Sequence, residues 1–498
     1  MLVARGVGRA AAPYAPLPGR RLSLRGSFPV RMSPMGLFGG GKGLFGASRG
    51  VNKNTDYVVL GGGVAAGYLA RELVDAGLAR GRVCIVSEEP VAPYERPALS
   101  KGVLSPGGAK LPGFHTCVGA GGKSQGPDWY KEQGVELLLS TKASLVDANK
   151  KWVMLEDGSL VNYEKLFVAT GCRPRTLGVP GESSLAGVHA VKTLGDAEGL
   201  MHDLEGEAGI KKKKDVVVVG GGFLGIEVAA ALAQNWAESP CLGQVTLVAS
   251  GGSLLDRVWP AQDVSTRYEE LFRSKGVDLV FNEAVVELEG DEGRVKNVAL
   301  ASGKRLDADV VVVAVGSTPN VEVLEGVADM AEGSVGGIRV DGRFRTSAEG
   351  VYALGDVAAF PAEGGLKRVE HVDHARRSAA HAVTCMRDPA KAQEYRHVPY
   401  CYSRFFDRHW QLHGETTNDA VVVGDFAPKL AAFFLDDASP KRIRGVFLES
   451  GTPDEFALAR AIAQARPVRA PGSLASAPSV EDALDVAHKG AKWWKGED

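Results

Sequence analysis

Two glycine-rich turns constrain the fold of this chain more than any other feature. Each follows a short apolar run and opens an alanine-containing stretch that is typical of a helix. In the dinucleotide-binding fingerprint the first glycine permits the turn, the second lets the backbone approach a pyrophosphate, and the third small residue lets helix and strand pack closely. The pyrophosphate then sits at the helix N-terminus, where free N–H groups and the helix dipole favour an anion. The two turns are Gly61-x-Gly63-x-x-Ala66, within residues 56–70, and Gly220-x-Gly222-x-x-Gly225, within residues 215–233.

One such turn is weak evidence, but two that lie about 160 residues apart predict two nucleotide sites. We expect FAD at the first turn and a nicotinamide nucleotide, NADH or NADPH, at the second. The alternative is a pair of close-packed turns that bind nothing. The strand after the first turn ends in Glu88 and Glu89, which suit ribose hydroxyls. The strand after the second turn is followed by residues 249–252 (ASGG), without acid or arginine, so the sequence leaves the nucleotide open. Gly251→Glu is expected to sharpen selection for NADH.

Other segments indicate that the first domain is built from both sides of the second. Apolar strands stop at Gly171 and Gly316, and a third strand ends in Gly355-Asp356, which would place a carboxylate beside the ribityl and phosphate groups of a flavin. The fold class we predict is α/β, with two Rossmann-like dinucleotide-binding domains and an α+β C-terminal domain. The expected boundaries are 1–55 (transit peptide and linker), 56–175 and 316–385 (FAD-binding), 176–315 (NAD(P)-binding), 386–470 (C-terminal domain) and 471–498 (tail).

The C-terminal part predicts strands and then a helix. The strands are expected at residues 420–423, 431–435 and 443–448, and the helix at residues 453–464. The stretch 470–479, rich in Ala, Pro and Ser, is interpreted as a linker to a short tail helix.

The first 55 residues differ from the rest in charge. They hold nine basic residues and no acid, and leave 49 basic and 60 acidic residues for the remainder. This composition is typical of an organellar transit peptide, with the glycine-rich residues 36–46 as a flexible linker. A secretory signal is excluded because no uninterrupted apolar core is present; a basic tail without function is the alternative. Composition does not separate chloroplast from mitochondrion, and we favour the chloroplast stroma.

Charge and hydropathy also limit the partners. The formal net charge of −2 disfavours nucleic acid as a partner. We expect a small-molecule substrate. No membrane span is predicted, because the most apolar stretch, residues 216–233, contains several glycines and Glu227. Oligomeric state stays open between monomer and homodimer.

Cysteine spacing argues against two kinds of chemistry. No two cysteines stand in a C-x-x-C or C-x4-C spacing, which disfavours a redox dithiol on one loop and a cysteine-clustered zinc site. Buried thiols are expected instead. His371, His374 and His381 fit one helix, but no carboxylate or cysteine set completes a metal site, so we predict no metal. The six cysteines are Cys84, Cys117, Cys172, Cys241, Cys385 and Cys401.

Several longer stretches resemble the flavoprotein reductases of the glutathione reductase superfold and, within them, the monodehydroascorbate reductases. They are spread from Asp56 to about Pro467, and the first, second and fifth are more specific than the glycine turns. The stretches are YVVLGGGVAAGYLAREL, VAPYERPALSKG with LPGFHTCVG, VVVVGGGFLGIEVAAAL, GVYALGDVAAFP, RVEHVDHARRSA and VPYCYSRFFD.

The resemblance implies a role for each matching residue. FAD contacts are expected from residues 61–66, from the acids and cations of the following loop, and from the helix start near residue 370. The nicotinamide nucleotide is expected at the second turn. The implied FAD ligands are Gly61, Gly62, Gly63, Val64, Ala65, Ala66, Glu89, Arg96, Lys101 and Asp356, and the implied nicotinamide-side residues are Gly220, Gly222, Phe223, Gly225 and Glu227. Further cofactor contacts are expected from positions at strand ends and before a helix, namely Glu88, Gly171, Gly316, Glu370 and His371.

Catalytic roles are expected for Arg376, Tyr402, Lys101, Glu227 and His371. The resemblance implies a monoanionic ring radical as substrate, and a guanidinium offers it paired donors. Cations beside a flavin favour its reduced, anionic form. The alternative for Arg376 is a structural ion pair, and the alternative for His371 is a packed, hydrogen-bonded ring. The alternative for Arg96 and Lys101 is a pair of solvated surface charges. Tyr402 is preferred over its neighbour Tyr400 only because of the motif match. A buried carboxylate at residue 227 needs a partner, and Lys101 is the expected one.

The implied reaction is hydride transfer from NAD(P)H to flavin, followed by two one-electron transfers that recycle monodehydroascorbate radicals to ascorbate. One alternative is a flavoprotein reductase of a small iron–sulfur protein, although the acidic remainder of the chain does not favour a basic docking surface. Another is a slow-turnover redox-sensing flavoprotein. A disulfide reductase is disfavoured by the missing dithiol.

Overall fold

The computed structural model describes residues 53–107, 125–206, 212–256, 258–259, 261–390 and 392–489. Residues 1–52 of the predicted leader, Cys117 with the LPGFHTCVG stretch, and the end of the predicted tail lie outside these residues.

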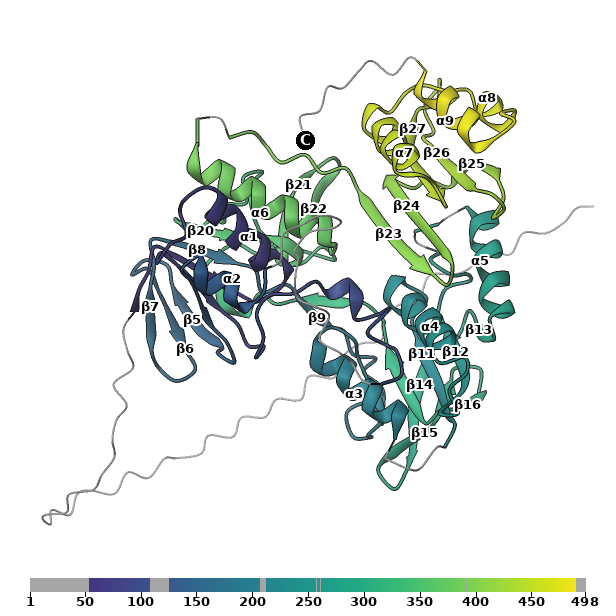
Figure 1. Cartoon of the computed structure of the whole chain (residues 1–498), viewed down its shortest axis with the longest axis horizontal. Helices are drawn as coiled ribbons and strands as arrows, with labels where there is room; N and C mark the ends of the chain where they lie inside the picture. Colours follow the sequence, from purple (N-terminus) through teal and green to yellow (C-terminus); the bar gives the residue numbers. More distant parts are fainter. Residues whose placement is uncertain are drawn as a thin grey trace, which may run out of the picture. The chain divides into compact units, whose positions relative to one another are not determined.

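The predicted FAD-binding domain is built on a five-stranded parallel sheet in the order β20-β8-β2-β3-β4. The sheet is apolar because helices and loops cover it, as parallel strands require. Helices α1 and α6 pack against each other, although about 300 residues separate them in sequence (Figure 1). The elements are β2 (Tyr57–Leu60), α1 (Val64–Asp75), β3 (Val83–Val86), α2 (Pro127–Glu132), β4 (Val135–Leu138), β8 (Lys165–Val168), β20 (Val351–Ala353) and α6 (Val372–Arg387).

The second parallel sheet has the order β10-β17-β11-β12-β13 and repeats the same plan. A three-stranded antiparallel sheet, β14-β15-β16, packs beside it. The elements are β10 (Val188–His189), α3 (Leu194–Glu205), β11 (Lys214–Val219), α4 (Phe223–Asn235), β12 (Leu242–Val248), α5 (Gln262–Ser274), β13 (Val277–Val280), β14 (Val285–Asp291), β15 (Arg294–Leu300), β16 (Arg305–Asp307) and β17 (Val310–Val313).

The chain passes between these domains through two paired strands. Strand β9 (Cys172–Pro174) leaves the first sheet and pairs antiparallel with β18 (Ser317–Pro319), which returns from the second. Gly171 (φ +65°) and Gly316 (φ +108°) turn the chain at the start of each crossing. The prediction that the first domain is built from both sides of the second is thus confirmed, and the numerical boundaries stay predictions.

The remaining strands of the first domain form small sheets around it. One has the order β1-β7-β6-β5 and another β19-β21-β22. The elements are β1 (Lys53–Asn54), β5 (Ala143–Asp147), β6 (Trp152–Leu155), β7 (Leu160–Asn162), β19 (Ile338–Arg339), β21 (Ala358–Ala362) and β22 (Gly365–Arg368), with 3-10 turns η1 (Arg96–Ala98), η2 (Glu322–Leu324) and η3 (Gly355–Val357).

The C-terminal domain is an antiparallel sheet in the order β23-β24-β27-β26-β25 with helices packed on it. The predicted strands and helix are confirmed, but residues 470–479 are not a simple linker. Residues 471–475 form helix α8 because Leu474 is buried in the domain core. The elements are β23 (Tyr400–Phe405), β24 (Arg408–Gly414), β25 (Asp419–Gly424), β26 (Leu430–Leu435), β27 (Ile443–Glu449), α7 (Pro453–Ala465), α8 (Pro471–Ala475) and α9 (Val480–His488).

One hydrophobic core joins three parts of the chain. It contains the second parallel sheet, the inner face of the C-terminal sheet, and residues from the loop 94–104 of the first domain. Trp410 lies at its centre, 5.1 Å from Trp259 and 5.7 Å from Phe223 between ring centroids. This shared core fixes the loop that carries Lys101 against helix α4.

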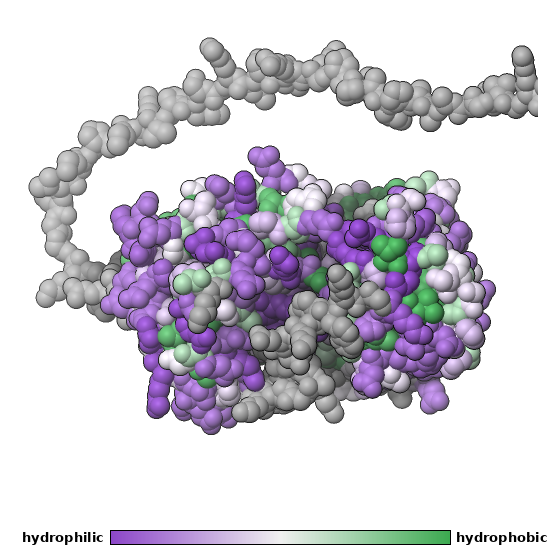
Figure 2. All heavy atoms as spheres, turned by 90° about the horizontal axis from the view of Figure 1, so that it is seen from above, coloured by the Kyte–Doolittle hydropathy of each residue, from purple (hydrophilic) through white to green (hydrophobic). Residues whose placement is uncertain are grey.

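The surface carries few large apolar side chains. Hydrophilic residues cover most of the described surface seen in Figure 2, and hydrophobic residues form small separate areas. Among the described residues, no helix combines the length and apolar composition that crossing a bilayer requires. Four described cysteines are buried, as expected, whereas Cys401 is only partly buried.

Candidate cofactor and substrate site

The first glycine turn provides the geometry that a bound pyrophosphate needs. Gly61 has φ +105°, and a Cβ there would overlap the carbonyl of Ala169. Gly63 is the N-cap of α1, and no side chain caps that helix end. The first N–H groups of α1 are therefore available to an anion. Ala66 is fully buried where helix and sheet meet.

A cavity of about 1310 Å³ opens at this turn. It extends from the carboxyl ends of β2 and β3 past loop 96–101 to helix α4 and strand β23. Most of the predicted site residues are brought together around it. The predicted residues that line it are Gly61, Gly62, Gly63, Val64, Ala65, Glu88, Glu89, Arg96, Lys101, Gly171, Phe223, Glu227, Asp356, Glu370, His371 and Tyr402. The predicted residues outside its lining are Ala66, Gly220, Gly222, Gly225, Gly316 and Arg376.

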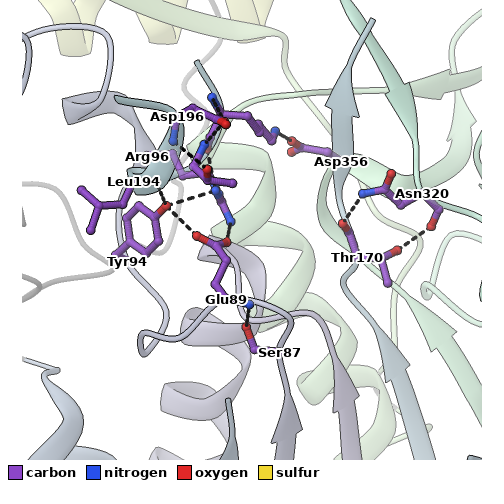
Figure 3. A network of polar contacts seen from close by, with 11 residues as sticks. Ser87, Glu89, Tyr94, Arg96, Thr170, Leu194, Asp196, Asn320 and Asp356 are labelled. Atoms are coloured by element: carbon purple, nitrogen blue, oxygen red, sulfur yellow. Dashed lines mark hydrogen bonds and ion pairs between the residues drawn. The ribbon is translucent and has the colours of Figure 1, made fainter. Parts of the chain in front are cut away.

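Glu89 is held rigidly at the wall of this cavity. Its carboxylate is paired with the Arg96 guanidinium and accepts a hydrogen bond from the Tyr94 hydroxyl at 2.7 Å (Figure 3). The Tyr94 oxygen in turn accepts from the Leu194 N–H at 2.7 Å, and Arg96 also donates to the Lys192 carbonyl at 2.6 Å. An acid in this place suits a ribose diol.

Asp356 faces the same cavity from 3-10 turn η3. Burial raises the pKa of its carboxyl, and Lys192, with Nζ 3.5 Å from the carboxylate, opposes that shift. Lys192 was not among the predicted residues. Its own N–H donates to Asp196 at 3.0 Å, which fixes the segment that carries it (Figure 3).

Cys172, Asp356 and Glu370 form a second polar cluster, in which the potential ligand atoms lie within 4.8 Å of one another. The cation among them is Arg368, whose Nη1 is 2.7 Å from Glu370 and 3.1 Å from the Cys172 sulfur. Burial raises the pKa of the Cys172 thiol to about 12, so the thiol is neutral. We interpret the cluster as an ion-pair network and assign no metal to it.

The pair Lys101 and Glu227 is confirmed. Lys101 Nζ lies 2.6 Å from Glu227 Oε2. The same carboxylate accepts hydrogen bonds from the hydroxyls of Ser100 and Ser403, each at 2.5 Å. Glu227 is on α4, Ser100 on the loop of the first domain and Ser403 on β23, so one carboxylate joins three parts of the fold. Neither serine was predicted, because their convergence on Glu227 is a tertiary event without a local signal.

His371 is the N-cap of α6, at the cavity. Its Nδ1 accepts a hydrogen bond from the Asp373 N–H at 3.1 Å. Burial, with a smaller contribution from Lys101, lowers the pKa of His371 to about 4 despite the opposing charge of Asp373. The ring is therefore neutral near pH 7, with its proton on Nε2. It packs edge-on against Tyr400 and Tyr402, with centroids 5.4 and 5.3 Å away.

The two residues implied as substrate contacts stand in different environments. Tyr402 lines the cavity, and burial, followed by the charges of Glu95, Glu227 and Asp373, raises its pKa to about 12. The Arg376 side chain is 43% exposed, and its Nη2 lies 3.0 Å from Asp373 Oδ1. The structural ion pair considered as the alternative is thus present. Burial raises the pKa of Glu95, and the hydrogen bond from Tyr68 and the charge of Arg376 oppose that shift.

The second glycine turn repeats the first in detail. Gly220 has φ +127°, and a Cβ there would overlap the carbonyl of Ala314; one on Gly225 would overlap the carbonyl of Gly220. Gly222 is the N-cap of α4, again without a side-chain cap. Downstream, residues 249–252 after β12 contain no acid, but the carboxylate of Asp256, from later in the chain, lies against Gly251.

One further pair of unpredicted residues fixes the crossing between domains. The Thr170 hydroxyl donates to the Asn320 carbonyl at 2.6 Å, and the Asn320 amide donates to the Thr170 carbonyl at 2.9 Å (Figure 3). Both residues line the cavity. The only sequence signal was their position next to Gly171 and Gly316.

Two dinucleotide folds, a shared cavity and a joined C-terminal domain define a class of flavin- and nicotinamide-dependent oxidoreductases. Residues 55–379 match the family described as pyridine nucleotide-disulphide oxidoreductase. Residues 398–481 match the C-terminal domain described as monodehydroascorbate reductase 3-like.

Curated relatives identify the branch of this class. The chain is 42% identical to the chloroplastic/mitochondrial monodehydroascorbate reductase of Arabidopsis thaliana, over 93% of each chain. It is 41% identical to monodehydroascorbate reductase 5, chloroplastic, of Oryza sativa subsp. japonica, over 88% of each chain. The chain belongs to the monodehydroascorbate reductase family.

Solved structures of related proteins share the fold. A ferredoxin reductase from Rhodopseudomonas palustris is 28% identical, with a TM-score of 0.74, and the match covers 87% of this chain and 100% of that one. The reductase of a covalent putidaredoxin reductase–putidaredoxin complex is 27% identical, with a TM-score of 0.73 and coverage of 87% and 99%.

Proposed function

We propose that this chain is an organellar FAD-dependent oxidoreductase that uses NADH or NADPH to reduce monodehydroascorbate to ascorbate. The observation that carries the proposal is the cavity in which the first glycine turn, the Lys101–Glu227 pair and Tyr402 meet. Relatives that match nearly the whole chain are named for this activity. Bound FAD supplies the conversion of a two-electron hydride donor into a one-electron donor.

The residues of the cavity fit FAD. The N-terminus of α1 and Gly61–Gly63 would hold its pyrophosphate, since the turn has no side chain in the way. Glu89, fixed by Arg96 and Tyr94, would accept hydrogen bonds from the adenosine ribose. Asp356 and Lys192 would lie beside the ribityl and phosphate groups.

On the nicotinamide side, Glu227 and Lys101 would orient the reacting ends of the two cofactors. Because Glu227 also accepts from Ser100 and Ser403, its carboxylate has one fixed position. Lys101 would contribute positive charge to a cofactor bound in the cavity, which favours an anionic reduced form. Phe223, stacked on Trp410, closes the apolar wall between the cavity and the shared core.

On the substrate side, Tyr402 presents a neutral hydroxyl and His371 an Nε2–H donor to the cavity. Arg376 lies outside the lining of the cavity, on helix α6 that His371 caps, and would provide the charge that an anionic radical requires. Its pairing with Asp373 holds the guanidinium in place while leaving part of it open to solvent. These roles are proposals for residues that the resemblance first indicated.

For location and assembly, we propose the chloroplast stroma in preference to the mitochondrion, with residues 1–55 as the import signal. The acid-free, basic composition of that segment supports import, and one of the relatives is named chloroplastic. We propose a small molecule rather than nucleic acid as the partner, and a monomer or homodimer as the working form.

An acceptor comparison tests the proposal. The purified full-length chain should be yellow, with about one FAD per chain, and should reduce monodehydroascorbate generated in situ with either nucleotide as donor. An iron–sulfur protein of the ferredoxin type is the competing acceptor, because two structural neighbours act in such systems. Turnover with the iron–sulfur protein but none with the radical would contradict the proposal. A folded chain that stays colourless after incubation with FAD would contradict it as well.

A further inference from the structure

We infer that Asp256 supplies the carboxylate that binds the adenosine ribose of the nicotinamide nucleotide and makes this chain select NADH over NADPH. The inference rests on the proposed function only in assigning that nucleotide to the second glycine turn. It goes beyond the sequence analysis, in which residues 249–252, without acid or arginine, left the choice of nucleotide open.

The position of the carboxylate is the first observation. Strand β12 ends at Val248, and residues 249–252 contain no acid. A Cβ built on Gly251 would overlap the Asp256 carboxylate, with its Cγ 2.7 Å away. Asp256 therefore occupies the space into which an acidic side chain at residue 251 would extend.

The loop that carries Asp256 is anchored to the glycine turn itself. The Leu255 N–H donates to the Gly221 carbonyl at 3.1 Å, so the residue just before Asp256 is bound to the fingerprint. At the other side, the Asn282 N–H donates to the Gly251 carbonyl at 2.9 Å. Leu254 and Leu255 are buried, at 0% and 2% exposure. The loop that leads into Asp256 is thus fixed at Leu255 by the glycine turn and at Gly251 by Asn282, just after β13.

The carboxylate is also available to a ligand. Asp256 is exposed, and among the described residues none makes a hydrogen bond or ion pair with its carboxylate. This differs from Glu89 at the first site, whose carboxylate is shared between Arg96 and Tyr94. In parallel α/β folds the ribose lies at the carboxyl end of the strand after the glycine turn, which is where Asp256 stands.

The chemistry follows from the charge. A carboxylate accepts hydrogen bonds from the 2′- and 3′-hydroxyls of an unmodified ribose. A 2′-phosphate in the same place would be repelled by the like charge. Asp256 therefore favours NADH, and Gly251→Glu, which adds a second carboxylate in space already filled by the first, should not sharpen the selection while Asp256 is present.

Nucleotide binding to the flavin-loaded protein tests this inference without catalysis. Dissociation constants of NAD⁺ and NADP⁺ are measured by titration calorimetry for the wild type, for Asp256→Asn and for the control Asp278→Asn, which changes an exposed acid on β13. We expect Asp256→Asn to weaken NAD⁺ binding about tenfold or more, the size of a lost charge-assisted hydrogen bond. It should also bring the two dissociation constants together, while Asp278→Asn leaves both unchanged.

A double variant that moves the carboxylate tests whether the loss of binding in the Asp256 variants comes from the missing charge or from a disturbed loop. Asp256→Ala combined with Gly251→Glu moves the carboxylate back to the strand end and should recover the preference for NAD⁺ that Asp256→Ala alone loses. NAD⁺ binding that is unchanged in Asp256→Asn would overturn the inference and leave the proposed function intact. A wild type that binds neither nucleotide would overturn both.

Discussion

The two glycine turns of this chain have nearly the same backbone but different surroundings. Around the first, the strand-end acid Glu89 is enclosed by Arg96, Tyr94 and the backbone of residues 192–194. Around the second, the strand end lacks an acid, and the nearest carboxylate, that of Asp256, has no partner among the described residues. A cofactor that stays bound gains from a preorganised, closed site, whereas a nucleotide that must leave after each cycle requires an open one. The difference indicates a resident FAD and an exchanging nicotinamide nucleotide.

Replacing the first glycine of each turn by alanine is expected to give the largest effect, with a different cofactor lost at each site. Gly61→Ala and Gly220→Ala both force a Cβ into a carbonyl at a positive φ. We expect Gly61→Ala to be isolated without flavin, and Gly220→Ala to keep its flavin but lose reduction by NADH. Visible absorbance and anaerobic rapid mixing measure the two outcomes, with a thermal melt to confirm folding. Loss of flavin from Gly220→Ala alone would reverse the assignment.

Arg376 and Arg377 provide a matched pair at the substrate side. Both contact Asp373, at 3.0 and 2.7 Å, so each takes part in the structural ion pair. If Arg376 also binds the radical anion, Arg376→Ala should lower kcat/KM for the radical roughly ten- to hundredfold, the size of one or two charge-assisted hydrogen bonds. Arg377→Ala should not, and flavin reduction by NADH should be normal in both. Equal defects in the two variants would show that Arg376 contributes only a structural ion pair and does not bind the radical.

Glu227→Gln tests the role of the carboxylate charge at the boundary between the two sites. The amide keeps hydrogen bonds but removes the charge that pairs with Lys101. We expect flavin reduction by NADH to slow about tenfold, from the loss of one charge-assisted contact. Ser403→Ala, which removes a single neutral donor to the same carboxylate, should have a smaller effect in the same direction. A larger effect for the serine variant would show that the C-terminal sheet, not the charge, governs the rate.

The smallest expected effect concerns pH and the histidines beside α6. Burial lowers the pKa of His371, His397 and His413 to about 4 and that of His374 to about 3. Unfolded histidines titrate near a pKa of about 6.5, so between these values the unfolded chain binds more protons than the folded one. The contribution of the neutral rings to the free energy of unfolding is therefore fully present above about pH 6.5, the unfolded pKa. It is lost as the solution is acidified toward about pH 4.

Differential scanning calorimetry measures this dependence. The Tm should drop by several degrees between about pH 7 and about pH 5 in the wild type. The drop should be smaller in His397→Leu, which removes one titrating ring from the group. A Tm that is constant or rises on acidification would contradict the assignment of buried, neutral rings.

The sequence predicted what is encoded locally. The two turns, the apolar strands and the helix at residues 453–465 follow from spacing, glycine placement and capping, which act over a few residues. The Lys101–Glu227 pair was predictable because a carboxylate on the first turn of a buried helix needs a cation. The family resemblance supplied which cation.

Other contacts depend on long-range convergence and had no such signal. Ser403 reaches Glu227 across 176 residues, and Lys192 reaches Asp356 across 164. Asp256 was missed because it stands in the place of residue 251 only after its loop folds back onto Gly221. The short helix in residues 470–479 was missed because burial of Leu474, not local propensity, stabilises it.

The most direct test of the account is the electron balance of the reduced protein. The flavin-loaded chain is reduced anaerobically with one equivalent of NADH, and monodehydroascorbate generated by pulse radiolysis is then added while radical decay and flavin reoxidation are followed together. The account predicts that about two radicals are consumed for each NADH, far faster than they disproportionate, with ascorbate as the product. Radical decay at the uncatalysed rate, with the flavin still reduced, would contradict it.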